Sequence, residues 1–204
     1  MKVYGSVTSP YVRKVRILAL EKGIHCEFVV ADAWGADSPV PKLNPLGKVP
    51  VFERDDGKIL FDSPLICEYL DSLKSPALIP ASGEPRWQAL SVHALAQGML
   101  DATVARLLES RRAEAQKSLE VIARQEQKIA RALDYASGLV AGRSFLVGDK
   151  FGYADLSLAV ALDYLDFRYA HPWRDKHAAL GRWLATINDR PSFRETMAPG
   201  MERR

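Results

Sequence analysis

The chain has 204 residues, of which 48% are apolar and 26% are charged, proportions that are ordinary for a globular protein with a substantial core. Its 28 basic and 25 acidic residues give a net charge of +3, and the two signs are interleaved along the sequence. A nucleic-acid-binding protein is expected to carry a concentrated basic stripe, so we expect no nucleic-acid partner.

Membrane and redox signals are also missing from the sequence. No apolar run approaches the length of about 20 residues that spans a bilayer, and the N-terminus lacks the apolar core of a signal peptide. Cys26 and Cys67 lie far apart within apolar segments and form no metal-binding or disulfide pattern. We therefore expect a cytoplasmic protein with no membrane association and no metal.

The chain begins with alternating strand and helix signals. Residues 2–6 and 25–30 predict strands, and residues 10–23 between them predict a helix that starts after Ser9 as N-cap and stops at Gly23. A strand–helix–strand order favours a parallel pair of strands joined by a right-handed crossover.

The stretch NPLGKVPVFERDDGKILFDSPLI, residues 44–66, predicts a hairpin followed by a helix. Two short apolar strands flank the turn at 55–57, and the helix covers about 64–73 with Ser63 as its N-cap. Pro50 stands at the head of the first strand, where it cannot donate to a strand ladder. It must therefore lie at an edge or serve a special purpose.

Composition changes beyond this point. Residues 74–85 are rich in Pro, Ser and Gly, which is typical of a linker, and the apolar residues that follow recur at helical spacing without strand alternation. Helices are predicted over residues 86–113, 117–140, 153–168 and about 178–188. In FGYADL, Gly152 is the predicted N-cap and Asp155 is placed to accept a hydrogen bond from the Gly152 backbone, as in a capping box.

Two hydroxyls stand at the turn from the first strand into the first helix. Thr8 and Ser9 lie where the helix N-terminus favours an anion, and such a hydroxyl can donate to a thiolate and lower the pKa of the thiol. A plain N-cap serine explains the same residues without a ligand, so this feature alone decides nothing.

Two further features suit an extended peptide. If the Val49–Pro50 bond is cis, the Val49 backbone is left at an edge where a ligand can pair with it as an added strand. Ser63 begins a helix whose N-terminus can hold a carboxylate, and Asp62 is available to an amino group. Together with the hydroxyl pair, these features favour a peptide-like ligand that carries a thiol.

The sequence resembles the glutathione S-transferases, especially small bacterial members, over essentially its whole length. The motifs that carry this resemblance, in the order of the family, are TSPYVRK at 8–14, LEKGI at 20–24, LNPLGKVPV at 43–51, DSPLICEYLD at 62–71 and FLVGDKFGYADL at 145–156. The resemblance implies a thioredoxin-like α/β domain over residues 1–74, with a mixed four-stranded sheet and a cis Pro50. A linker at 75–85 and an all-α helical bundle domain at 86–204, which contributes the second-substrate site, would follow.

The resemblance also implies an activity, which is the attack of a glutathione thiolate on an electrophilic small molecule, with glutathione as co-substrate. Ser9 matches the catalytic hydroxyl of the family, and Thr8 competes with it for this role. The implied glutathione-binding residues are Ser9, Trp34, Gly35, Lys48, Val49, Pro50, Asp62, Ser63 and, reaching across a homodimer, Asp101. The more usual family residue at position 62 is Glu, so the contact made by the shorter Asp62 is expected to shift.

Alternatives follow from the same fold. The chain could be a glutathione-binding or protein-interaction module without catalysis, or a glutathione-dependent thiol–disulfide oxidoreductase, although Ser9 stands where such enzymes carry cysteine. Residues that can either line a second-substrate pocket or form ordinary core are Met99, Thr103, Leu107, Tyr164 and Phe167. Arg106, Arg111 and Arg112 can receive an acidic substrate or simply form a solvated helix face.

Overall fold

The computed structural model describes residues 1–35 and 37–201, which fall into two compact units. The first unit consists of Met1–Ala81 together with Arg190–Met201, and the second consists of Ser82–Asp189. The sequence-based division placed residues 190–201 in the helical domain, whereas they cluster with the first unit. The last three residues of that predicted domain, 202–204, lie outside the described residues.

The first unit is built on a four-stranded mixed sheet, as predicted. Its strands are β1 (Lys2–Gly5), β2 (Glu27–Val30), β3 (Val51–Glu53) and β4 (Ile59–Leu60), in the spatial order β2-β1-β3-β4. β1 pairs with β2 in parallel, and β3 is antiparallel to both β1 and β4. The Val49–Pro50 peptide bond is cis, which confirms the prediction for Pro50. A short helix, α2 (Val40–Leu43), precedes β3.

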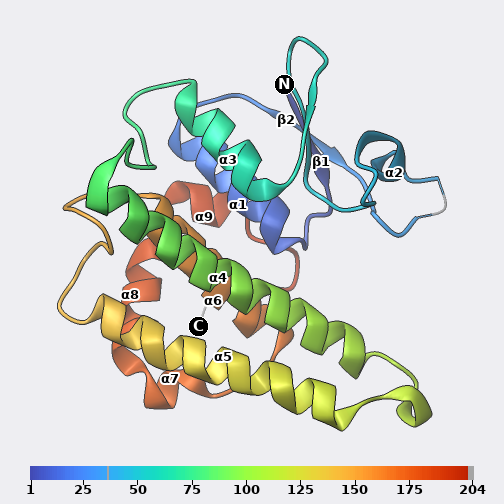
Figure 1. Cartoon of the computed structure of the whole chain (residues 1–204), viewed down its shortest axis with the longest axis vertical. Coiled ribbons are helices and arrows are strands. Elements are labelled where there is room, and N and C mark those ends of the chain that lie inside the picture. Colours follow the sequence, from blue (N-terminus) through green and yellow to red (C-terminus); the bar gives the residue numbers. More distant parts are fainter. Residues whose placement is uncertain (36, 202–204) are drawn as a thin grey trace. The chain divides into compact units, whose positions relative to one another are not determined.

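Helix α1 (Pro10–Glu21) links the two parallel strands and has the predicted ends. Ser9 is its N-cap, and Gly23 follows its end with a φ of 57°, in the left-handed region that glycine favours. A Cβ atom at Gly5 would collide with the Val12 side chain, so the helix packs closely over the end of β1 only because residue 5 is glycine. The buried side of α1 also packs against α3 (Ser63–Ser72), which lies beside it in Figure 1.

The chain returns to α1 at its C-terminal end through α9 (Pro191–Glu195), a helix that the sequence analysis did not predict. Arg190 Nε and Nη2 donate to the two carboxylate oxygens of Glu21 at 2.9 and 2.6 Å. Near the start of α1, buried Arg13 donates to the Phe193 carbonyl at 3.2 Å. Residues separated by more than 160 positions therefore fix α1 along its length.

A buried ion pair attaches the segment that follows α3 to the end of α1. Lys22 Nζ lies 2.8 Å from Asp71 Oδ1, and both side chains are almost fully buried. The Asp71 carboxylate also accepts hydrogen bonds from the backbone N–H groups of Leu78 and Ile79 at 2.8 and 2.9 Å, and Lys22 donates to the Pro76 carbonyl. Because both charges have several partners, the desolvation cost of burying the pair is offset.

The second unit is helical, as predicted. Its elements are α4 (Gly83–Ser110), the short 3₁₀ helix η1 (Glu114–Gln116), α5 (Leu119–Val140), α6 (Tyr153–Arg168), α7 (Trp173–Lys176) and α8 (Ala178–Asn188). α4 runs beside α5 in Figure 1 and also packs on α6, which is buried at every position from Tyr153 to Leu165. Within residues 1–35 and 37–201, no helix is both long and apolar enough to cross a membrane.

The buried carboxylate of Asp155 holds the start of α6. Asp155 Oδ2 accepts from the Gly152 N–H at 2.9 Å, which confirms the predicted capping contact. The other oxygen accepts from the Leu146 N–H at 2.8 Å, so one fully buried side chain also fixes the preceding loop.

We expect Asp155→Ala to lower the free energy of unfolding by about 2–4 kcal/mol, because it leaves buried backbone N–H groups without a partner. Asp149→Ala, which removes an exposed carboxylate from the same loop, is the matched control and should change stability by less than about 0.5 kcal/mol. Urea unfolding of both variants measures the difference. Equal losses would show that the Asp155 contacts do not stabilise the fold.

A histidine ties α5 to the end of α7. The buried His177 ring accepts or donates a hydrogen bond at Nδ1 with Ser137 Oγ at 2.9 Å, and its Nε2 lies 3.6 Å from Asp134 Oδ1. Burial lowers the pKa of His177, and the charges of Lys176 and His171 act in the same direction, while Asp134 opposes them.

A lowered pKa means that unfolded His177 binds a proton more readily than folded His177, so its contribution to stability is complete above about pH 6.5 and declines as the pH falls below that value. We expect His177→Asn to reduce the loss of stability between about pH 7.5 and about pH 5.5. His25→Asn is the matched control, because His25 is exposed and makes none of these contacts. Denaturant midpoints across this range provide the test, and an unchanged slope for His177→Asn would contradict it.

Candidate functional site

The register of the sheet brings the predicted ligand-binding segments to one end of the first unit. Tyr4 pairs with Val51, so the residues after β1 lie beside those before β3. Phe52 pairs with Leu60, so the residues after β4 lie on the other side of the same β3 end. Continued by one residue, the first register places Pro50 beside Gly5, and continued by two residues, the second places it beside Asp62. Gly5 also pairs with Val30 in parallel, which brings the loop after β2 to this end as well.

The turn between β1 and α1 presents two half-buried hydroxyls. Ser9 Oγ accepts a long hydrogen bond of 3.4 Å from the Val12 N–H, so the hydroxyl proton of Ser9 remains available to another acceptor. Thr8 Oγ1 lies 3.0 Å from Ser6 Oγ, which also accepts from the Thr8 backbone N–H at 3.2 Å. Ser9 and Thr8 are thus held differently, one by its own helix and the other by Ser6.

Ser6 was not among the predicted site residues. Its side chain accepts from the N–H two residues later, which is a local turn that serine favours after a strand. The Ser9 N–H donates to the Ser6 carbonyl at 3.2 Å, so Ser6 organises the whole turn. A serine directly after a predicted strand was the available signal, but it was hidden by the stronger TSP pattern.

The loop before β3 is fixed by a second residue that sequence reasoning did not single out, Asn44. Its buried side chain donates from Nδ2 to the Lys48 carbonyl at 2.8 Å and accepts from the Leu46 N–H at 3.0 Å. These bonds set the course of the chain just before Val49. Among the described residues, no hydrogen bond joins the Val49 backbone to a neighbouring strand, so its polar groups are available to a partner.

The segment after β4 places Asp62 and Ser63 at the start of α3. The N-cap is Asp62, one residue earlier than predicted, and its exposed carboxylate makes no capping hydrogen bond. Ser63 is the first helical residue and is buried. The Phe61–Asp62 peptide bond is cis. The first N–H groups of α3 have no partner within the helix, so they suit an anion.

The remaining predicted residues differ in their placement. Trp34 and Gly35 follow β2 at the same end of the sheet, and the Trp34 side chain is 84% exposed. Lys48 is exposed in the loop that Asn44 holds. Asp101 belongs to α4 of the second unit, so it is not one of the residues that the sheet register brings together.

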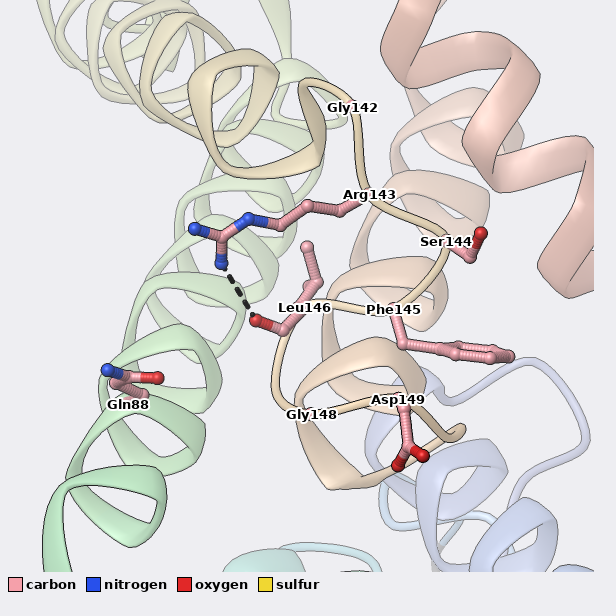
Figure 2. Close-up of a pocket in the computed structure, with 8 residues that line it drawn as sticks. All are labelled: Gln88, Gly142, Arg143, Ser144, Phe145, Leu146, Gly148 and Asp149. Carbon is pink, nitrogen blue, oxygen red and sulfur yellow. Dashed lines mark hydrogen bonds between the residues drawn. The ribbon is translucent and has the colours of Figure 1, made fainter.

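A pocket of about 470 Å³ lies in the second unit, between the first turns of α4 and the loop from α5 to α6 (Figure 2). The residues that line it are Gln88, Gly142, Arg143, Ser144, Phe145, Leu146, Gly148 and Asp149. Arg143 Nη1 donates to the Leu146 carbonyl at 3.2 Å, which keeps this arginine bound to its own loop, as Figure 2 shows. No predicted site residue lines this pocket.

The described part of the chain contains no group of three or more His, Cys, Asp or Glu residues placed to hold a metal ion. Its two cysteines are free thiols. Cys67 is buried in α3, and Cys26 directly precedes β2. Because β2 runs parallel to β1, Cys26 lies at the end of the sheet opposite to Ser9. Burial raises the pKa of the Cys26 thiol, which keeps it protonated.

Comparison with known proteins identifies the fold and its relatives. Residues 3–78 match the model of the glutathione S-transferase N-terminal domain, and residues 120–186 match that of the C-terminal domain. The uncharacterized GST-like protein YibF of Escherichia coli K12 is 38% identical over 98% of this chain and 99% of its own length.

Solved structures agree with this assignment. A glutathione S-transferase from Methylobacillus flagellatus KT with glutathione bound superposes with a TM-score of 0.94, at 36% identity, over 97% of this chain and 99% of that protein. A glutathione transferase family member from Pseudomonas fluorescens Pf-5 with bound S-(propanoic acid)-glutathione gives a TM-score of 0.86, at 36% identity, over 98% and 100% of the two chains. With both family domains matched along one chain and a relative of this identity over its full length, the protein belongs to the glutathione S-transferase family.

Proposed function

We propose that this protein binds glutathione at the shared end of its sheet and transfers the glutathione thiolate to an electrophilic carbon of a small molecule. The observation that carries the proposal is the register of β3, which gathers the α1 hydroxyls, the Val49 backbone and the α3 N-terminus at one place. The two similar structures described above hold glutathione or a glutathione conjugate, which supports the choice of ligand.

Each part of the tripeptide has a suitable partner. The cysteinyl residue would pair with the backbone of Val49, in the manner of an added strand. The γ-glutamyl carboxylate would accept hydrogen bonds at the start of α3, including the Ser63 N–H and hydroxyl, while Asp62 would hold the amino group. Lys48 and the loop of Trp34 and Gly35 would meet the glycyl end.

Ser9 is proposed as the hydroxyl that stabilises the thiolate. A thiol with a pKa of about 8.5 is only a few per cent ionised at neutral pH, and lowering the pKa by about two units raises the thiolate fraction more than tenfold. The Ser9 O–H and the positive end of α1 both favour the anion. In the transfer, the thiol proton leaves to solvent, the sulfur forms a bond to the electrophilic carbon, and any leaving group departs with its electron pair.

The arrangement of the cysteines disfavours the oxidoreductase alternative. Thiol–disulfide exchange needs an accessible, ionised enzyme thiol near the substrate sulfur. Cys26 lies at the far end of the sheet and has a raised pKa, and Cys67 is buried within α3. Assembly as a homodimer in the cytoplasm, with Asp101 of the partner subunit near glutathione, belongs to the same proposal, and light scattering distinguishes the dimer from a monomer.

Calorimetric titration followed by an activity assay tests the proposal. We expect glutathione to bind with a stoichiometry of one per chain, and we expect the loaded protein to conjugate at least one member of a panel of aryl halides, epoxides and activated alkenes. Binding without turnover of any electrophile would favour the non-catalytic alternative. Absence of glutathione binding at millimolar concentration would overturn the proposal altogether.

The roles of the two hydroxyls are separated by variants that spare the helix. We expect Ser9→Gly, which remains a tolerable N-cap, to raise the pKa of bound glutathione by about 1–2 units, because the donor to the thiolate is lost. Thr8→Val keeps the shape of the side chain and should change that pKa by less than about half a unit. Ultraviolet absorbance of the bound thiolate against pH gives both values. A larger pKa shift for Thr8→Val than for Ser9→Gly would show that Thr8, and not Ser9, donates to the thiolate.

A further inference from the structure

Asn44 has a hydrogen bond from each of its polar groups. Its backbone N–H donates to the Val40 carbonyl, and its own carbonyl accepts from the Gly47 N–H, both at 2.8 Å. Its side chain donates from Nδ2 to the Lys48 carbonyl at 2.8 Å, and Oδ1 accepts from the Leu46 N–H at 3.0 Å. The side chain is only 2% exposed, so water competes little for these bonds.

The loop that Asn44 organises is attached to the core of the first unit. Val40, which accepts the Asn44 N–H, is fully buried in one cluster with Val51 and Ala31. The Val49 side chain packs partly against the same cluster. Because protein interiors are closely packed, a residue bonded to this cluster is held firmly. Asn44 therefore has a fixed position from which to orient the chain that follows.

The bond from Asn44 to Lys48 sets the orientation of one peptide unit. The Lys48–Val49 peptide is trans, so its C=O and N–H groups point in opposite directions. Asn44 Nδ2 holds the C=O group on the side of the buried amide, and the Val49 N–H consequently points away from that side. Within residues 1–35 and 37–201, this N–H has no hydrogen-bond partner. A buried side chain thus directs a backbone donor that the described residues do not use.

Formation of the turn alone does not explain both side-chain bonds of Asn44. An Asx turn needs only the bond from Oδ1 to the N–H two residues later, which is that of Leu46. Aspartate makes the same turn, but its carboxylate has no donor for the Lys48 carbonyl. The Nδ2 bond is therefore additional to the turn, and it requires an amide at position 44.

We propose that Asn44 is a positioning residue for glutathione, which acts through the Lys48–Val49 peptide. The inference rests on the proposed function of the site. The Val49 N–H donates to the cysteinyl carbonyl of glutathione, and Asn44 holds this N–H in the bonding direction before the ligand arrives. Such preorganisation raises affinity because less of the chain has to be ordered on binding. Since the polar groups of Asn44 are already bonded, it leaves the thiolate to Ser9.

Calorimetric titration of the full chain with glutathione tests this role. We expect Asn44→Ala and Asn44→Asp each to raise the Kd for glutathione about tenfold, although Asn44→Asp keeps the acceptor for the Leu46 N–H. The pKa of the bound thiol, measured by ultraviolet absorbance, should stay within about half a unit of the wild-type value, because Ser9 and α1 are unchanged.

Asn188→Ala is the matched control. Asn188 ends α8 in the second unit and donates from Nδ2 to Asp163 Oδ1 at 2.6 Å. Its replacement also removes a side-chain amide that is bonded within the fold, but it leaves the loop before β3 intact. We expect the Kd of this variant for glutathione to differ from that of the wild type by less than about twofold.

An analogue of glutathione isolates the contact with Val49. Replacement of the cysteinyl carbonyl by a methylene group removes the acceptor for the Val49 N–H and keeps the thiol and the γ-glutamyl group. Asn44→Ala should weaken binding of this analogue by less than about twofold, because the contact that Asn44 orients is already missing. A tenfold loss for both ligands would show that Asn44 supports the whole site, and it would overturn the inference.

The remaining outcomes separate this inference from the proposed function. Absence of glutathione binding by the wild type at millimolar concentration would overturn both. Binding by the wild type with an unchanged Kd for Asn44→Asp would overturn only the inference, because the turn alone would then suffice. A shift in the pKa of the bound thiol as large as that of Ser9→Gly would also overturn it. Circular dichroism confirms folding, and the isosteric Asn44→Asp carries the test if Asn44→Ala does not fold.

Discussion

The antiparallel pairing of β3 with both of its neighbours is the constraint on which the candidate site depends. β3 has only three residues, yet its two faces are fixed independently. Val51 is buried against Ala31 and Val40 on one face, and Phe52 is buried on the other, with its ring 5.7 Å from that of Tyr69. A shift by one residue would exchange these faces, so burial on both sides sets the register.

A hydrogen bond across the sheet adds to this constraint. The Tyr4 hydroxyl donates to Glu53 Oε2 at 2.5 Å, and this bond is the main reason why the pKa of Tyr4 is raised to about 12. The bond joins β1 to β3 on the face that carries Val51. With the register fixed, chain connectivity brings Pro50 near Gly5 and Asp62, while Ser6 fixes the turn after β1 and Asn44 fixes the loop before β3.

Helix α1 is itself fixed in place by residues that are distant in the sequence. Ser9 is its N-cap. Arg13 donates to the carbonyl of Phe193 in α9, and Glu21 accepts from Arg190, the residue before α9. Just beyond the helix, Lys22 enters the buried pair with Asp71. The hydroxyl that we propose to stabilise a thiolate needs such support, because small displacements of a catalytic group are costly.

Local signals in the sequence were sufficient for most elements of the first unit and for naming the segments that we propose to bind glutathione. Some features depend on residues within a few positions of one another, so they can be recognised from the sequence. These are the helix caps Ser9 and Gly23, the hairpin turn and the capping contact of Asp155. The helices α7 and α9 are too short to show periodicity. The association of residues 190–201 with the first unit rests on pairs such as Arg190 and Glu21, 169 positions apart, which no local pattern reveals.

Contacts that follow from the shared family fold can be separated from those that depend on the side chains of this chain. The proposed glutathione contacts use backbone groups, helix ends and two hydroxyls, which the shared fold positions whenever its strand register is kept. The exposed long side chains of the helical unit, such as Arg111 and Arg112, lie outside that register. At 36–38% identity, relatives can therefore keep the first set of contacts while differing in the second. We therefore expect selectivity for a second ligand to depend on the side chains of the helical unit and not on the fold.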